Sequence, residues 1–137
     1  MNDAQLKVIF AETKTIAAVG LSSNPARASN RVCEYLQRVG YRVLPVNPNE
    51  AEVLGEKAYA DLASVPVPVD LVLVFRAPEA VPPIVEDAIR IGAKTVWMQD
   101  GAGNPAAAQR AEAAGLSVVV DDCMLRQHAR LIRQAAS

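Results

Sequence analysis

Small polar residues cluster in the segment GLSSNP, which begins at residue 20, and their types suit an anionic ligand. The glycine lets a ligand approach the main chain, because a side chain at that position would block it. The serines and the asparagine donate hydrogen bonds to phosphate oxygens, and an arginine further on adds a charge-assisted contact. We therefore predict a phosphate-binding segment made of Gly20, Leu21, Ser22, Ser23, Asn24, Pro25 and Arg27.

Three later segments place polar or charged residues directly after apolar runs. The candidate binding residues in these segments are Asn47, Pro48, Arg76, Gln99 and Asp100. Arg76 and Arg27 are both candidates for contact with phosphate, and the spacing of the sequence does not decide between them.

Five short runs rich in Val, Ile and Leu must position these segments. The runs cover residues 15–20, 42–46, 71–75, 95–98 and 117–120. They do not alternate polar with apolar residues, which is typical of strands buried on both faces of a parallel sheet.

The stretches between these runs have apolar residues at the spacing of a helix. It predicts helices over 29–39, 78–91 and 105–114, terminal helices over 3–13 and 123–135, and a short helix over 50–54. Strands separated by helices predict the α/β class. We expect a single doubly wound Rossmann-type domain spanning residues 1–137, with a five-stranded, mainly parallel sheet and helices on both faces.

Ligands of open α/β sheets bind outside the carboxyl ends of the strands, where the strand order reverses. The polar segments described above all follow predicted strands, so the sheet should bring them together at one edge. The sequence therefore predicts a nucleotide site at this edge.

The usual nucleotide fingerprints are absent from the segment after the first run. The turn lacks the second and third glycines of G-x-G-x-x-G, and Asn47 stands where an acidic residue would bind a ribose. There is also no G-x-x-x-x-G-K-[ST] motif for ATP or GTP. An NAD(P)-binding protein is therefore the alternative and not the first hypothesis.

A catalytic centre would need a nucleophile with a base, and the best candidate pair is Cys123 with His128. A cysteine beside a methionine is more often a small buried residue, and the histidine is expected to pack locally. Cys33 and Trp97 are expected in the core. We predict no catalytic residues, no metal site and no enzyme activity.

Composition narrows the class of protein further. The chain has 137 residues, a net charge of −1 and no basic stripe, so we expect no nucleic-acid partner. The first residues form neither a signal peptide nor a membrane anchor, and the cysteines are few and far apart. We expect a cytoplasmic protein with no membrane contact.

An ordered set of short motifs resembles a known family. The set runs VGLSSNP, VLPVNP, GEKAY, VDLVLVFR and GAKTVWMQ, from residue 19 to residue 99, and ends with Cys123, Met124 and His128. It is similar to the family of small stand-alone CoA-binding proteins, whose domain resembles the N-terminal domain of the succinyl-CoA synthetase alpha subunit. The resemblance covers residues 15–130.

The resemblance implies coenzyme A, or an acyl-CoA, lying across the strand ends. It places residues 20–25 over the phosphates, Asn47, Pro48, Phe75 and Arg76 around the adenosine, and residues Met98–Asp100 towards the pantetheine arm. The ligase's second domain is missing, so the resemblance implies a binding module. A protein partner or a homo-oligomer is left open, as is an interaction domain with a vestigial nucleotide site.

Overall fold

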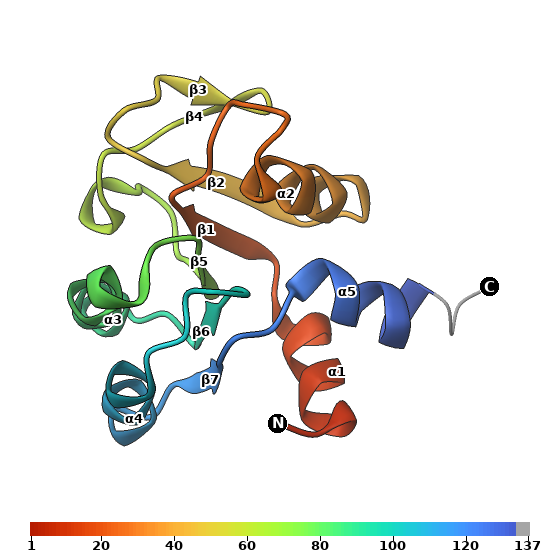
Figure 1. Cartoon of the computed structure of the whole chain (residues 1–137), viewed down its shortest axis with the longest axis vertical. Coiled ribbons are helices and arrows are strands. Elements are labelled where there is room, and N and C mark those ends of the chain that lie inside the picture. The colour runs from red at the N-terminus through yellow and green to blue at the C-terminus, as the bar shows by residue number, and fades with distance from the viewer. Residues whose placement is uncertain (134–137) are drawn as a thin grey trace.

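A five-stranded parallel sheet forms the centre of the molecule in the computed structural model, which describes residues 1–133 (Figure 1). Its strands are β1 (Thr15–Val19), β2 (Arg42–Val46), β5 (Leu71–Val74), β6 (Thr95–Met98) and β7 (Ser117–Val119). All neighbouring pairs in the sheet are parallel, and most strand side chains are buried. The predicted α/β Rossmann-type fold is confirmed.

The strands lie in the order β2-β1-β5-β6-β7. The chain therefore passes from β1 to a neighbour on one side, and then crosses to the other side of β1 for β5. Ala17 of β1 accordingly pairs with Leu44 on one side and with Val72 on the other. This reversal is the point at which open α/β sheets bind their ligands.

Helices cover both faces of the sheet (Figure 1). One face carries α1 (Asp3–Glu12), α2 (Ala28–Arg38), α5 (Met124–His128) and the π-helical turn Ala129–Arg133, whose apolar side chains join Ile16 and Ala18 in one core cluster. The other face carries α3 (Val81–Arg90) and α4 (Pro105–Ala113), which pack on Ala17 and Val19. Successive residues of β1 thus face opposite helical layers, as the pleat of a strand requires.

The short helix predicted over residues 50–54 is wrong. The chain forms the antiparallel pair β3 (Glu52–Val53) and β4 (Glu56–Lys57) there. The turn between them holds Leu54 at φ 53° and Gly55 at φ 81°. Two successive positive φ values suit a two-residue hairpin and end any helix.

Two predicted helices are present, but each is divided into two parts. The helix expected from Pro78 begins with a 3₁₀ turn, Pro78–Ala80, before α3. Another 3₁₀ turn, Leu62–Ser64, lies between β4 and β5. The C-terminal helix divides into α5 and the π-helical turn, and residues 134–135 of the prediction lie outside the described residues. Within residues 1–133 no helix combines the length and apolar character that crossing a membrane requires.

Candidate functional site

A cavity of about 620 Å³ opens at the carboxyl ends of the strands, beside the point where the strand order reverses. Seven predicted binding residues line it: Gly20, Ser22, Arg27, Asn47, Phe75, Arg76 and Asp100. The other lining residues, which the sequence reasoning did not select, are Ala28, Ser29, Asn49, Glu50, Ala77, Gly101 and Ala102. The fold thus brings residues from four separate loops to one place.

Gly20 stands at the tightest approach between two of these loops. Its φ is 91°, and a Cβ built on it would lie 2.5 Å from the carbonyl oxygen of Phe75 and 3.2 Å from Nε of Arg76. The contact that excludes a side chain is therefore made by the protein's own main chain. Glycine here lets the end of β1 lie against the end of β5. Gly20, Phe75 and Arg76 then line the cavity side by side.

The segment after β1 is ordered by its own polar side chains. The Ser22 N–H donates to the Ser29 hydroxyl (3.1 Å), and the Asn30 amide donates to the Ser22 carbonyl (2.9 Å). The Asn24 carboxamide accepts the Ala26 N–H (2.9 Å). These bonds tie the loop to the first turn of α2 and fix its path over the cavity.

The first turn of α2 faces the cavity without a side-chain cap. Arg27 is the N-cap residue, its side chain makes no capping hydrogen bond, and Ala28 and Ser29 line the cavity. Uncapped N–H groups and the positive end of the helix dipole favour an anion at this position.

The two arginines of the cavity form no ion pair among the described residues. Neither the Arg27 nor the Arg76 side chain forms an ion pair or a hydrogen bond with any other residue within 1–133. Arg76 is half-buried, and its Nε lies close to Gly20. Together with the open helix end, these side chains make the cavity suited to phosphate groups.

The opposite side of the cavity is built by the loop after β6. Asp100 accepts two hydrogen bonds from Arg126 (3.0 and 3.2 Å), and the Asp121 carboxylate accepts the N–H groups of Gly101 and Gly103 (3.2 and 2.8 Å). Two carboxylates therefore connect the loop after β6 to the segment that follows β7, which fixes this side.

The sequence matches the profile of a family described as a CoA binding domain over residues 14–129. The chain belongs to this CoA-binding domain family. The predicted resemblance to small stand-alone CoA-binding proteins is confirmed.

Known proteins are similar to this chain in sequence, and one solved structure has nearly the same fold. The uncharacterized protein YneT of Bacillus subtilis is 39% identical over 126 residues, which are 92% of this chain and 93% of that protein. A hypothetical protein from Pyrococcus horikoshii OT3 has a structure with a TM-score of 0.94 and 41% identity, over 96% of this chain and 93% of that chain. The alpha subunit of an ADP-forming acetate–CoA ligase II from Pyrococcus furiosus is 36% identical over 66 residues, 47% of this chain and 14% of that subunit.

Seven predicted binding residues of this CoA-binding domain protein do not line the cavity. Leu21, Met98 and Gln99 are buried, and the Gln99 side chain accepts the Met124 N–H (2.8 Å). Pro48 lines a neighbouring cavity of about 190 Å³, which shares Arg76 with the larger one. The remaining three, Ser23, Asn24 and Pro25, are exposed on the loop after β1 and do not line the cavity.

The candidate catalytic pair, Cys123 with His128, is not supported by the geometry. His128 is buried, and its Nδ1 shares a 2.8 Å hydrogen bond with the Tyr35 hydroxyl. The rings of Phe10 and Tyr41 pack edge-on against it, with centroids 5.3 and 5.8 Å away. Cys123 is half-buried against the same core, so both residues pack as the sequence suggested.

Two further residues expected in the core are found there. Burial raises the pKa of the Cys33 thiol, and Trp97 is fully buried with its Nε1 donating to the Asp122 carbonyl (2.8 Å). Within residues 1–133 no group of three or more His, Cys, Asp or Glu is placed to hold a metal ion.

Burial of His128 predicts a loss of stability in mild acid. Burial, and then the nearby Arg133 charge, hold the pKa of His128 below its usual value of about 6.5. The unfolded chain therefore binds a proton that the folded chain resists, and stability falls as the pH drops below about 6.5. Urea unfolding between pH 7.5 and pH 5.5 should show this decline.

A His128→Phe variant is the control for this experiment, because the sequence contains no other histidine. It should lose most of the pH dependence in this range. An equal decline in both proteins would show that another group is responsible.

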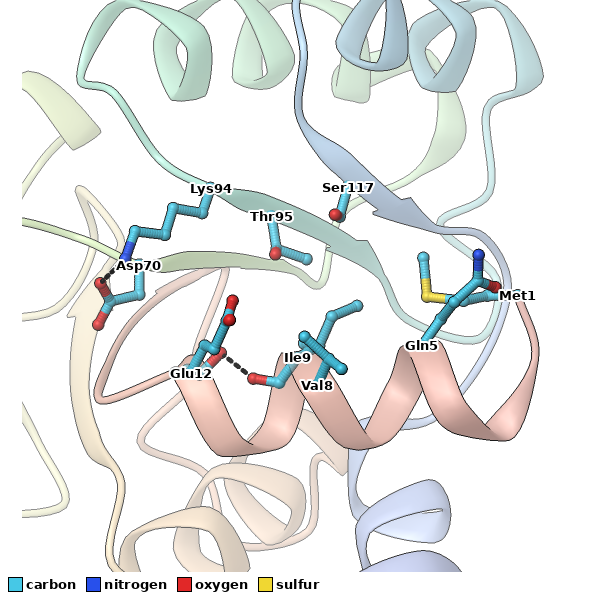
Figure 2. Close-up of a pocket in the computed structure, with 10 residues that line it drawn as sticks. Met1, Gln5, Val8, Ile9, Glu12, Asp70, Lys94, Thr95 and Ser117 are labelled. Atoms are coloured by element: carbon cyan, nitrogen blue, oxygen red, sulfur yellow. Dashed lines mark hydrogen bonds and ion pairs between the residues drawn. The ribbon is translucent and has the colours of Figure 1, made fainter.

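A second cavity, of about 230 Å³, lies at the amino ends of the strands, between α1 and the sheet (Figure 2). Its charged groups are largely matched within the protein. Burial alone would raise the pKa of Asp70, but the N–H groups of Thr15 and Lys14 donate to its carboxylate and lower it, and Lys94 lies 3.9 Å away. The exposed Glu12 adds negative charge, so this cavity suits an anion less well than the one at the carboxyl ends.

Proposed function

We propose that this CoA-binding domain protein binds coenzyme A, or an acyl-CoA, in the cavity at the carboxyl ends of β1, β2, β5 and β6. The observation that carries the proposal is the meeting of two unpaired arginines, Arg27 and Arg76, with the uncapped first turn of α2 in one cavity. These are the groups that a diphosphate needs, and the family match makes CoA the nucleotide of choice.

The residues present fit the parts of the ligand. The first turn of α2 and the two arginines would hold the phosphates, and Asn47 and Phe75 would border the adenosine. The pantetheine arm would run towards Asp100 and the small residues that follow it. Bound CoA would supply a thiol or thioester. The protein's part in this proposal is to bind and orient the ligand, with no catalytic step of its own.

The setting of this activity is also part of the proposal. Cys33 and Cys123 are free thiols, which suits a reducing cytoplasm. A protein partner or a second copy of the chain would then use the bound CoA.

Thermal melting with CoA, acetyl-CoA, NAD, NADP and ATP at matched concentrations tests the proposal. A ligand at about a hundred times its dissociation constant stabilises the folded state by roughly 2.7 kcal/mol, which a melting curve resolves. We expect a shift with the CoA compounds and little or none with the others.

Isothermal calorimetry with CoA then gives the affinity directly. A shift with NAD and none with CoA would replace the ligand in this proposal. No shift with any nucleotide, together with a stable oligomer, would favour an interaction domain.

A further inference from the structure

Glu50 places a carboxylate in the wall of the cavity that is otherwise suited to phosphate. It follows β2 by four residues, and it is half-buried. The Ser23 N–H donates to its Oε2 (2.6 Å), and the Ser23 hydroxyl donates to its Oε1 (3.0 Å). Each oxygen of the carboxylate is thus bound by a donor from the loop after β1.

The donors that Glu50 uses are those of an anion-binding group. A main-chain N–H and a hydroxyl of the same serine bind a carboxylate here, and the same pair binds a phosphate oxygen equally well. A phosphate that approached Ser23 would have to displace Glu50. We propose that Glu50 is a specificity-determining residue, whose carboxylate competes with ligand phosphates and so makes the affinity depend on how many phosphates the ligand carries. This inference rests on the proposed function, because it concerns the same cavity.

The loop after β1 is also held by contacts that do not involve Glu50. The Asn47 amide donates to the Leu21 carbonyl (3.1 Å), and Ser22 is held by Ser29 and Asn30 of α2. Replacing Glu50 with glutamine leaves these contacts in place, frees one of the two Ser23 donors and removes a like charge from the phosphates. We expect the removal of charge repulsion to contribute more to the affinity than the loss of one loop contact.

The test compares Glu50→Gln with the unaltered protein by calorimetry, using CoA, 3′-dephospho-CoA and pantetheine. CoA carries a 3′-phosphate besides its diphosphate, dephospho-CoA carries only the diphosphate, and pantetheine carries neither. We expect Glu50→Gln to bind CoA about three- to tenfold more tightly, from removal of a like charge near the protein surface. The gain should be smaller for 3′-dephospho-CoA and absent for pantetheine.

Two control variants distinguish the effect of the Glu50 charge from that of the net charge of the protein and from that of its contact with Ser23. Glu52→Gln makes the same change in net charge at an exposed position that does not line the cavity, and it should leave the affinity for CoA unchanged. Glu50→Asp keeps the charge but shortens the side chain, and it should not reproduce the gain. The gain in Glu50→Gln should also shrink between about 20 mM and about 500 mM salt, because screening weakens charge repulsion.

The outcomes separate this inference from the proposed function. If the unaltered protein binds CoA and Glu50→Gln binds it equally or more weakly, the inference is wrong and the proposed function stands. If neither protein binds CoA, the proposed function fails, and the inference fails with it. Melting of Glu50→Gln without ligand shows that the variant is folded in each case.

Discussion

Replacing Arg76 with glutamine is expected to weaken CoA binding by about 10- to 100-fold. The estimate follows from a hydrogen bond to a charged group, which contributes about 1.5–3 kcal/mol, where each 1.4 kcal/mol is about tenfold in affinity. Arg76 has no partner within residues 1–133, so its whole hydrogen-bonding capacity is open to a ligand. Calorimetry with CoA measures the effect directly.

Arg42→Gln is the matched control for this change. Arg42 begins β2, at the end of the sheet opposite the cavity, and it is exposed. The Arg42→Gln substitution removes the same charge as Arg76→Gln, and the affinity for CoA should stay within about twofold of that of the unaltered protein. Equal weakening in the two variants would mean that net charge, and not a contact at Arg76, governs binding.

Replacing Gly20 with alanine is expected to destabilise the fold and to damage the site together. The new Cβ would lie 2.5 Å from the Phe75 carbonyl oxygen, and the residue would be held at φ 91°. Backbone strain of this kind amounts to about 1–3 kcal/mol, and relief of the clash would move β1 away from the end of β5. Thermal melting should show a fall of roughly 10 °C, from about 4 °C per kcal/mol for a chain of this size.

Gly115→Ala isolates the clash from the backbone strain. Gly115 has almost the same φ, 93°, but a Cβ there would meet nothing within 4 Å. It should lower the melting temperature by only a few degrees, about 1 kcal/mol. If the two variants melt at the same temperature, the approach of Gly20 to Phe75 has no influence on stability.

The sheet was predictable because strands that are buried on both faces appear in the sequence as unbroken runs of apolar residues. Runs such as LVLV at Leu71–Val74 have no room for a polar residue, since one face meets α3 and the other meets α2. The pair of β3 and β4 was not predictable in the same way. Two-residue strands have no periodicity to detect, and the positive φ of Leu54 belongs to a residue type that seldom adopts it.

The position of the cavity could be predicted from the sequence, but only some of the residues that line it could. A parallel sheet must bring its loops together at one edge, so Arg76 and Ser22 could be selected because each follows a predicted strand. Glu50 could not be selected, because its contact with Ser23 depends on how two loops 27 residues apart meet. Met98 and Gln99 do not line the cavity because both side chains are buried at the end of β6. The Gln99 side chain accepts the N–H of Met124 at the start of α5 instead.

The ion pair between Asp3 and Arg130 has a consequence for how this domain can be joined to others. The Asp3 carboxylate accepts two hydrogen bonds from Arg130 (3.1 and 2.8 Å), so α1 and the last described turn are neighbours. The first turn of α1 and the last described turn therefore adjoin at one patch of the surface. Domains whose first and last elements adjoin tolerate insertion into a host protein, and they tolerate circular permutation. Evolution and protein engineering can thus combine this fold with new neighbours while the cavity at the strand ends stays open.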